Sequence, residues 1–582
     1  MRLIIGSIVL LSIAACSSQG DTETPASDSV LISVIGTNDV HGELLAAERS
    51  GGLTTLSGYV HAIRTARARD GGTVLLIDAG DMWQGTLESN LVEGRSVVEA
   101  YNAMGYTAAA IGNHEFDFGP EGEKAIATSE ADDPRGALRQ RIIEADFPVL
   151  SANIVNKSTG ELIDWENVTP SIMIETAGTR VGIIGLITAN ALQVTAPANT
   201  VGLEIAPLAD AIVREATKLR NDGADIVIVT SHAGGYCEEF TDPHDISTCN
   251  PNDEIVKVAN ALPPGLIDQI VAGHAHTPMA HFINGIAVTS AFSNTFAFDR
   301  VDYRVNSQTG ELLDLKIFPP QMNCPAYNRE SGDCEWTETD PALVRLPIYA
   351  GQTVRATAEL QVIAADAIAH TEAIKSEPLG VTLETDILLD GSPESPLGNL
   401  FTDAILQEVD ADISIHNVTG GIRSVLLAGP LTFGDIYEIA PFDNRVVILD
   451  VAGADLRRII AVQAHRTSRR AGFSGMRVFI GCEQGETSVR MVLNNGHEIL
   501  DDDRIRISSN DFLAALGDGI LSAGMPEGGY QYDDDPRFNR DLLVSWFKKR
   551  GGSLSHRQFE TTEANRRWNF SESFVAQCQD GV

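Results

Sequence analysis

The sequence predicts an α/β protein of two domains joined by a helix, on the basis of three observations. The chain has 582 residues, more than a single hydrophobic core usually holds. Up to about residue 320, apolar runs such as "TVLLIDAG" and "ADIVIVTS" alternate with amphipathic segments such as "LADAIVREATKLRND". Continuous β-branched runs are typical of strands buried on both faces and covered by helices. A long helical pattern, "TAELQVIAADAIAHTEAIKS", then precedes a second group of strands.

The first residues are typical of an export signal. Arg2 is followed by the apolar run "LIIGSIVLLSIAA", which is short for a membrane span, and then by Cys16. "SIAAC" resembles the lipobox of bacterial lipoproteins, in which the cysteine becomes the lipidated N-terminus. Ser17 and Ser18 follow, with no aspartate of the kind that retains lipoproteins in the inner membrane. We therefore expect a periplasmic protein anchored to the outer membrane by lipid, with soluble secretion as the alternative.

The chain divides into five segments on these patterns. We expect a lipoprotein signal peptide at residues 1–16 and a Ser-, Thr- and Asp-rich tether at 17–28. The first domain then covers residues 29–340, the linker helix lies within 341–382, and the second domain covers 383–582. No internal repeat is visible, and nothing in the sequence predicts an oligomeric state.

The charge of the chain excludes one class of partner. Apolar residues make up 43% and charged residues 21%, as in ordinary globular proteins, but the formal net charge is −38. Binding to a nucleic-acid polymer requires a basic surface, so we expect no such partner. We interpret the acidic balance as a surface adapted to solubility or salt.

Six cysteines follow Cys16, and their even number in an exported chain favours disulfides. Six cysteines allow fifteen pairings, which the sequence alone leaves open. Local spacing favours the pairs Cys237–Cys249 and Cys324–Cys334, which leaves Cys482 for Cys578. The chain has no CxxC pair, so a thiolate zinc site is not expected.

Side chains that bind metals follow five of the predicted strands in the first domain. They lie in "TNDVHGE", "DAGDMWQG", "IGNHEFD", "VTSHAGG" and "AGHAHT". Ligands of open α/β sheets bind outside the carboxyl ends of the strands, so these loops should meet in one crevice. A lone histidine after a strand is usually a packing residue, but five such motifs together argue against that interpretation. The candidate residues are Asp39, His41, Asp81, Asn113, His114, Asp117, His232, His274 and His276.

The donor set of these loops indicates two divalent metal ions. Imidazole, carboxylate and amide donors without thiolates suit Zn²⁺, Mn²⁺ or a similar ion. The donors exceed what one ion needs, whereas two ions that share a carboxylate would use them. Two ions about 3.5–4 Å apart generate a hydroxide nucleophile and neutralise the oxygens of a phosphate ester. The sequence therefore predicts phosphoester hydrolysis.

The ordered motifs D-x-H, GD, GNHE-x-D, H and GH-x-H resemble the calcineurin-like metallophosphoesterases. Within them, the chain is similar to the 5′-nucleotidase and UDP-sugar hydrolase family over nearly its whole mature length. The resemblance implies a four-layer αββα first domain and a C-terminal α/β substrate-binding domain. It also implies that His114 faces the phosphate while Asp117 orients and charges it, as the catalytic pair. The implied ligands are Asp39, His41, Asp81 and His276 for one ion, and Asp81, Asn113, His232 and His274 for the other.

Three stretches of the second domain match the family's substrate-binding pattern. "TGGIRS" offers Gly421 for close backbone approach and Arg423 as a donor to phosphate oxygens. In the family, two aromatic rings sandwich the base, an asparagine reads its edge and an aspartate binds the ribose. The matching residues are Phe442, Asn444, Phe512 and Asp518. The chain departs from the family in lacking an arginine before "LGN", and Asn417 lies one residue further from Arg423 than usual.

The resemblance implies a periplasmic 5′-nucleotidase that attacks nucleoside 5′-monophosphates, and also UDP-sugars, with a hydroxide generated at two metal ions. A 2′,3′-cyclic-nucleotide phosphodiesterase with 3′-nucleotidase activity is the alternative within the fold. Such relatives tend to have asparagine at the place of Asp117. A thiosulfohydrolase shares the metal domain but would not need the base-binding aromatics. An alternative from another class is a lipoprotein that binds nucleotides without cleaving them, which would not need the metal ligands.

Overall fold

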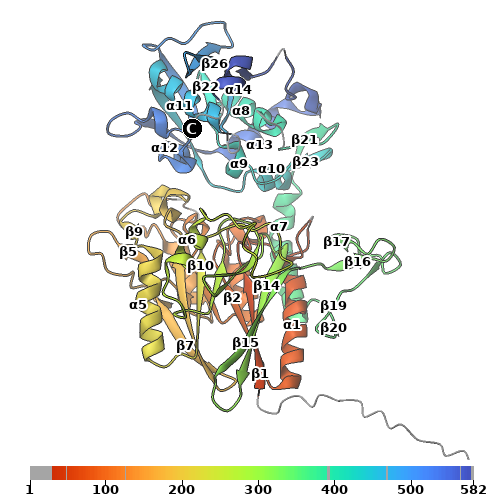
Figure 1. The fold of residues 1–582 in the computed structure, drawn as a ribbon. Helices are drawn as coiled ribbons and strands as arrows, with labels where there is room; N and C mark the ends of the chain where they lie inside the picture. The colour runs from red at the N-terminus through yellow and green to blue at the C-terminus, as the bar shows by residue number, and fades with distance from the viewer. Residues whose placement is uncertain are drawn as a thin grey trace, which may run out of the picture.

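The computed structural model describes residues 29–578 apart from residues 48, 123, 125, 390–393, 467–469 and 564. The expected signal peptide, Cys16 and the tether lie outside the described residues. Two α/β units are joined by helix α7 (Ala358–Lys375), with the first unit red to green and the second cyan to blue in Figure 1. Within the described ranges, no helix is both long and apolar enough to cross a membrane.

Two sheets packed face to face form the centre of the first unit. The seven-stranded sheet has the order β15-β14-β1-β2-β3-β4-β6, and the six-stranded sheet has the order β12-β13-β11-β10-β8-β7. In the first sheet these are β1 (Ser29–Thr37), β2 (Thr73–Asp78), β3 (Ala108–Ala110), β4 (Val149–Leu150), β6 (Val168–Thr169), β14 (Ala297–Asn306) and β15 (Leu312–Met322). In the second they are β7 (Ser171–Thr176), β8 (Thr179–Ile187), β10 (Ile226–His232), β11 (Gln269–Ala272), β12 (Met279–Ile283) and β13 (Ile286–Ser290).

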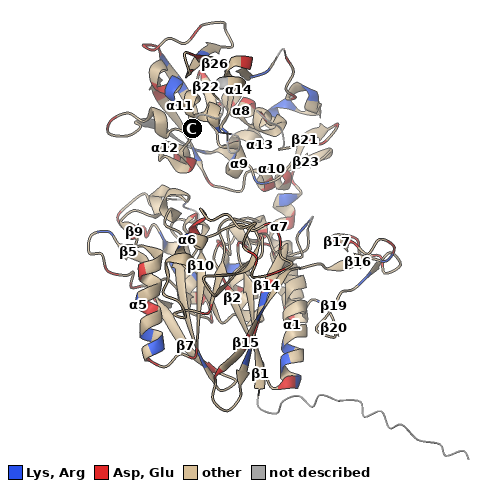
Figure 2. Ribbon diagram, in the orientation of Figure 1, with Lys and Arg blue, Asp and Glu red and all other residues tan. Residues whose placement is uncertain are grey.

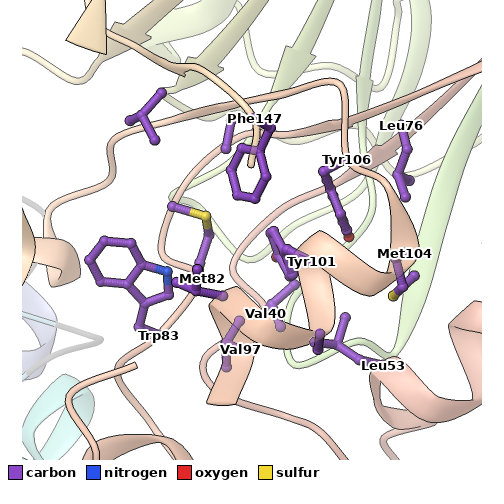
Figure 3. Close-up of a cluster of buried hydrophobic side chains, with 14 of the residues drawn as sticks. Val40, Leu53, Leu76, Met82, Trp83, Val97, Tyr101, Met104, Tyr106 and Phe147 are labelled. Carbon is purple, nitrogen blue, oxygen red and sulfur yellow. The ribbon is translucent and has the colours of Figure 1, made fainter. Parts of the chain in front are cut away.

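Apolar side chains fill the space between the two sheets, and they also cover the outer face of each sheet, beneath the helices. Val34 and Ile183 belong to the core between the sheets, where β-branched residues suit the pleated surface. Helices α1 (Gly52–Asp70), α3 (Arg95–Met104) and α4 (Gly136–Glu144) cover the seven-stranded sheet, over the core that includes the stacked rings of Tyr101 and Tyr106 (Figure 3). Helices α5 (Leu208–Asn221) and α6 (Glu254–Ala261) cover the other sheet. The predicted αββα layering is confirmed.

The second unit is also α/β. Its five-stranded sheet has the order β25-β22-β28-β24-β29, beside two three-stranded sheets of order β23-β21-β30 and β27-β26-β31. The strands are β21 (Pro378–Leu383), β22 (Ile413–His416), β23 (Gly429–Thr432), β24 (Arg445–Ala452), β25 (Gly472–Ser474), β26 (Met476–Glu483), β27 (Glu486–Leu493), β28 (Arg504–Asn510), β29 (Tyr532–Phe538), β30 (Gly552–Leu554) and β31 (Trp568–Phe570). The helices are α8 (Pro396–Glu408), α9 (Val418–Gly421), α10 (Phe433–Ile439), α11 (Gly453–His465), α12 (Asp511–Ala514), α13 (Asn539–Arg550) and α14 (Glu572–Gln577).

Helix α7 connects the two units and is held to the first one at its end. The ammonium of Lys375 donates to both carboxylate oxygens of Glu88, at 2.9 and 3.2 Å. Glu88 lies in the short helix α2 (Leu87–Asn90) and is largely buried. The remaining residues of the 341–382 segment join sheets on either side, since β18 (Val344–Arg345) pairs with β16 (Ala326–Asn328) and β21 pairs with β23.

Three disulfides staple the described chain, and all three expected pairs are confirmed. Cys482–Cys578 spans 96 residues and ties the chain just after α14 to β26. In the chain-entropy account a loop of that size stabilises the fold by about 4–5 kcal/mol. Cys237 and Cys249 lie near His281, but their sulfurs are bonded to each other and offer no thiolate to a metal.

Charged side chains of both signs are distributed over the two units. Figure 2 shows basic and acidic residues along both α1 and α5. This pattern is typical of a solvated surface and agrees with the interpretation of the net charge of −38.

Candidate dimetal active site

The carboxyl ends of the central strands from both sheets meet at one place. The hydroxyl of Thr230 in β10 donates to the carbonyl of Asp78 in β2 at 2.7 Å. Nδ1 of His232 donates to the carbonyl of Ala79 at 2.8 Å. These bonds between the two sheets bring the loops after β1, β2, β3, β10 and β11 together, as the sequence predicts.

Two groups of ligand-type atoms lie side by side in these loops. In the first group, Nε2 of His276 lies 3.1 Å from Nε2 of His41 and 3.3 Å from Oδ1 of Asp39. In the second group, Nε2 of His232 lies 3.1 Å from Oδ2 of Asp81, and His274 completes the set. Within each group the ligand atoms lie within 4.8 Å of one another.

The remaining candidates join the same site. Oδ1 of Asn113 lies 3.0 Å from Nε2 of His232, in the second group. The other carboxylate oxygen of Asp81 accepts the backbone N–H of His114 at 2.8 Å. Nitrogen and oxygen donors of this kind fit borderline divalent ions, and each group offers both kinds. The residues therefore fit two divalent ions.

Backbone carbonyls fix the tautomers of two histidines. Nδ1 of His41 lies 2.8 Å from the carbonyl oxygen of Gln84, and His232 makes the matching bond to Ala79. A carbonyl oxygen only accepts, so each Nδ1 carries a proton and Nε2 is the nitrogen that each ring turns toward the site. Outer hydrogen bonds of this type orient metal-binding imidazoles and raise their basicity.

The charge states of the site favour cations. Burial and the neighbouring His276 hold the pKa of His41 well below its ordinary value. Burial and the neighbouring His232 lower the pKa of His274 to about 4. Burial alone would raise the pKa of Asp39, but the imidazole of His276 lowers it to about 2. Neutral imidazoles at His41 and His274 beside the ionised Asp39 are protonation states that bind divalent ions. At His232, burial alone would lower the pKa, but the charge of Asp81 raises it to about 10, so a metal ion would have to displace a proton there.

Five of the predicted ligand positions have a left-handed backbone. The φ angles are 49° at Asp39, 51° at His41, 58° at Asp81, 73° at His274 and 57° at His276. Positive φ is uncommon outside glycine and concentrates at functional sites, where the surrounding structure maintains it. Sequence patterns do not predict this conformation, because the surrounding structure imposes it on residues other than glycine.

Glu115 supports the site and was missed by the sequence analysis. Its buried carboxylate accepts backbone N–H groups of Gly112 at 2.6 Å, Met82 at 2.7 Å and Asp81 at 2.8 Å. Burial and the charge of Asp81 raise the pKa of Glu115 to about 8, against the opposing effect of these donors. Glu115 thereby ties the loop that carries Asn113 to the loop that carries Asp81. Its place in the "GNHE" motif was a signal that could have identified it.

His114 lies between the metal-ligand groups and the second unit. Its Nδ1 lies 2.6 Å from Oδ2 of Asp117, whose other oxygen accepts the hydroxyl of Thr195 at 2.9 Å. On the opposite side, Nε2 of His114 lies 3.5 Å from a guanidinium nitrogen of Arg423. Burial alone would lower the pKa of His114, but the charges of Asp117 and Asp81 raise it above its ordinary value.

A cleft of about 250 Å³ opens beside His114, between the two units. Arg423 lies 5.2 Å over the ring of Phe442, which in turn stacks on His114 at 5.5 Å between ring centres. Among the described residues that line this cleft, Arg423 is the only arginine or lysine. The second unit lines it with Asn417, Gly420, Gly421, Arg423, Phe442, Asn444, Phe512 and Asp518, which include all six predicted substrate-binding residues.

The loop of Arg423 is held by two local contacts. Asn417 donates its side-chain amide to Oδ2 of Asp518 at 2.7 Å. A Cβ at Gly421 would lie 2.5 Å from Oδ1 of Asn417, so a larger residue there would displace the Asn417 side chain from its bond to Asp518. The group that lies close to the backbone of Gly421 is therefore the side chain of Asn417. Asn417 is the residue that lies one position further from Arg423 than in the family pattern.

These observations define a metal-dependent phosphoesterase with a two-domain cleft. Residues 32–278 match the calcineurin-like phosphoesterase family, and residues 369–523 match the 5′-nucleotidase C-terminal domain. The chain therefore belongs to the 5′-nucleotidase family of calcineurin-like metallophosphoesterases. The members of this family are phosphoric monoester hydrolases, and the chain is an enzyme of that class.

Individual relatives agree over most of the chain. Protein UshA of Yersinia enterocolitica is 26% identical over 518 residues, which cover 84% of this chain and 86% of that protein. A 5′-nucleotidase of Vibrio cholerae is 24% identical over 547 residues, covering 89% and 91%. The crystal structure of a 5′-nucleotidase precursor from Thermus thermophilus has a TM-score of 0.68 at 21% identity, covering 93% and 99%, and shows the same fold.

Proposed function

We propose that the chain is a periplasmic 5′-nucleotidase that hydrolyses nucleoside 5′-monophosphates to nucleoside and phosphate. Nucleoside diphosphate sugars form a second substrate class in this proposal. The observation that supports it best is the 3.5 Å approach of Arg423 to His114, which joins the predicted base-binding cleft to the predicted metal site. The proposal keeps the lipid anchor at Cys16, the outer-membrane location and the five-segment division of the chain.

The ligand assignment is part of the same proposal. One ion would be held by Asp39, His41, Asp81 and His276, and the other by Asp81, Asn113, His232 and His274. When bound, two such ions supply charge neutralisation at the phosphate and activation of water at neutral pH. Zn²⁺ and Mn²⁺ are the ions that we expect.

The residues around the phosphate would orient it and move one proton. Arg423 would donate to the non-bridging oxygens, where its planar guanidinium matches their geometry. His114 would carry the proton at Nε2 and give it to the departing ester oxygen. Asp117 accepts a hydrogen bond from Nδ1–H of His114. This bond favours the charged imidazole and fixes the orientation of its ring. Hydrogen bonds to the developing charge are stronger in a site that excludes water.

The nucleoside would lie between two rings of the second unit. Phe442 and Phe512 would stack on the base, Asn444 would bond its edge, and Asp518 would bind the ribose hydroxyls. Stacking is worth roughly 1–3 kcal/mol per base and tolerates every base, so we expect broad nucleotide use.

Phosphate release by a soluble form that begins after Cys16 tests the proposal, with Mn²⁺ and one substrate at a time. The substrates are 5′-AMP, 3′-AMP and 2′,3′-cyclic AMP, with a chelated sample as the control. We expect preference for 5′-AMP, loss of activity with chelator and recovery with Mn²⁺ or Zn²⁺. Preference for the 3′ or cyclic ester would favour the phosphodiesterase alternative. Nucleotide binding without any turnover would favour the binding lipoprotein.

A further inference from the structure

The chain that follows β8 lies against the predicted metal ligands and the proposed catalytic pair. β8 is parallel to β10 and ends beside His232, so residues 188–200 leave the sheet at the edge where the site lies. The backbone N–H of Thr188 donates to the carbonyl of His232 at 2.8 Å. The backbone N–H of Ala189 donates to the carboxylate of Glu254, at the start of α6, at 3.0 Å. The segment of residues 188–200, which we call the post-β8 segment, is thus fixed at its start.

Two amide side chains join the post-β8 segment to the loop after β3. The amide nitrogen of Asn113 donates to the carbonyl of Val194 at 3.0 Å. A carbonyl oxygen only accepts, so this bond leaves the amide oxygen of Asn113 on the side of His232, where it lies 3.0 Å from Nε2. The amide of Asn199 donates to the carbonyl of Phe116 at 2.9 Å. The post-β8 segment therefore sets which atom of Asn113 faces the second group of predicted ligands.

Between these two contacts, Thr195 bonds the carboxylate of the proposed catalytic pair. Its hydroxyl donates to Oδ1 of Asp117 at 2.9 Å, while Oδ2 of Asp117 accepts from Nδ1 of His114 at 2.6 Å. Each carboxylate oxygen is thus held by a donor. A β-branched side chain is stiff at χ1, so Thr195 presents its hydroxyl in a fixed direction. Turning the carboxylate away from the imidazole would break a buried hydrogen bond at each oxygen.

The position of Thr195 separates it from the groups that would touch the substrate. The cleft of about 250 Å³ beside His114, which we call the nucleoside cleft, is lined by Asn190, Val194, Thr195 and Ala196 of the post-β8 segment. Thr195 is only 2% exposed there, and its hydroxyl is directed to Asp117. Its effect on the reaction would therefore pass through the carboxylate and the imidazole.

We propose that Thr195 is a positioning residue, whose hydroxyl keeps the Asp117 carboxylate in the orientation from which His114 can give up its proton. The inference rests on the proposed function, in which His114 protonates the departing ester oxygen. In that step the oxygen of water bonds to phosphorus, the bond from phosphorus to the ester oxygen breaks, and the Nε2 proton passes to that oxygen. Without the hydroxyl, the carboxylate could turn away from Nδ1. The step would then slow for alcohols that leave poorly without a proton.

The first test removes the hydroxyl and keeps the shape of the side chain. We expect Thr195→Val to lower kcat for 5′-AMP about tenfold or more and to leave KM within about twofold, because only the transition state needs the proton. Thr195→Ser keeps a hydroxyl and should retain kcat within about threefold of wild type. An unchanged kcat in Thr195→Val would overturn the inference.

Thr200→Val is the matched control in the same segment. Thr200 is also buried, but its hydroxyl donates to the carbonyl of Pro197 at 3.1 Å, within the segment itself. We expect Thr200→Val to keep kcat for 5′-AMP within about twofold of wild type. Equal losses of kcat in Thr195→Val and Thr200→Val would show a general disturbance of the segment and would overturn the inference.

The second test varies the leaving group. The phenolate of p-nitrophenyl phosphate departs without a proton, whereas the alcohol of glycerol 2-phosphate needs one, as the nucleoside of 5′-AMP does. We expect Thr195→Val to slow p-nitrophenyl phosphate less than about threefold, and to slow glycerol 2-phosphate as much as 5′-AMP. The same loss on all three substrates would overturn the inference, since a distorted site slows every substrate.

A double variant tests whether the hydroxyl acts through Asp117. In the Asp117→Ala background, Thr195→Val should change kcat for glycerol 2-phosphate by no more than about twofold, because the group that it positions is absent. Losses that multiply would overturn the inference. The expected pattern on glycerol 2-phosphate in a chain that does not hydrolyse 5′-AMP would overturn the proposed function and leave the role of Thr195 standing. Hydrolysis of 5′-AMP with unchanged kcat in Thr195→Val would do the reverse.

Discussion

Nδ1 of His114 lies 2.6 Å from a carboxylate oxygen of Asp117, in a pair that is largely buried between the two units. This contact fixes which nitrogen of the imidazole faces the cleft, because Nδ1 donates to Asp117 and Nε2 points toward Arg423. It also opposes the effect of burial, since the charge of Asp117 raises the pKa of His114. In the proposed function, this pair supplies the proton for the departing ester oxygen.

Replacing the carboxylate should move the pH dependence of the reaction. Asp117→Asn removes a negative charge that raises the pKa of His114, so the charged imidazole should be lost at a lower pH. We expect kcat for 5′-AMP to fall about 100-fold and the alkaline limb of its pH profile to shift to lower pH. Steady-state kinetics from pH 5 to 10 with saturating Mn²⁺ give both values. An unmoved alkaline limb would remove Asp117 from the control of His114.

Removing the shared carboxylate should empty the metal site. Asp81 lies beside His232 and, through its backbone-bonded oxygen, beside His114. We expect Asp81→Ala to lose activity beyond detection and to retain less than one ion per chain, because both ions would lose a ligand. Elemental analysis after dialysis measures the ions, with Asp117→Asn as a control that should keep both. Two tightly held ions in Asp81→Ala would contradict the bridging role.

Glu115→Gln tests the support of the loops. The substitution replaces one acceptor oxygen by an NH₂ group, which then faces backbone N–H groups of Gly112, Asp81 or Met82. Leaving buried donors unsatisfied costs about 1–3 kcal/mol each. We expect weaker metal binding and a loss of kcat of about tenfold. Metal titration followed by activity measures both, and wild-type metal affinity would show that the carboxylate only stabilises the fold.

Phe512→Ala should affect substrate binding rather than the chemical step. The ring lines the nucleoside cleft, and stacking of a base on an aromatic ring contributes roughly 1–3 kcal/mol. We expect KM for 5′-AMP to rise about 5- to 150-fold with kcat little changed. Activity on p-nitrophenyl phosphate, which has no base, is the internal control. A parallel loss on both substrates would show that the substitution disturbs the fold instead.

Asp299 should make the first unit less stable as pH rises. It lies in β14 opposite Gly36 of β1 and is 0% exposed. Burial raises its pKa from 3.8 to about 7, and the Thr289 hydroxyl and the Gly36 N–H offset only part of that effect. Between these values the unfolded chain loses the proton while the folded chain keeps it, so the free energy of unfolding falls as pH rises. The free energy of unfolding falls in total by on the order of 4 kcal/mol, because each unit of pKa difference corresponds to about 1.36 kcal/mol.

Asp299→Asn should remove this dependence, because an amide does not titrate in that range. Urea unfolding at pH 4.5 and pH 7.5 compares the first transition of wild type and variant, with metal content held equal. We expect the variant to gain relative stability at the higher pH. Parallel changes in the two proteins would show that Asp299 keeps an ordinary pKa.

The fold could be predicted because it depends on local pattern, and the same motifs account for the candidate ligand groups that lie together. Continuous apolar runs predict β1, β2 and β10. A polar side chain directly after a parallel strand lies at the carboxyl edge of the sheet, where ligands of α/β proteins bind. Glu115 could not be assigned in this way, since its three partners come from two loops that meet only in the fold.

The left-handed backbone at five ligand positions limits which substitutions the site could accept during evolution. Asp and His tolerate positive φ better than most side chains, and they also provide the metal donors. A change of Asp81 to Glu or of His274 to Cys would preserve a ligand atom and yet meet a conformational penalty in the loop. New metal preferences in this scaffold are therefore more accessible at Asn113 and His232, where the chain is not held at positive φ.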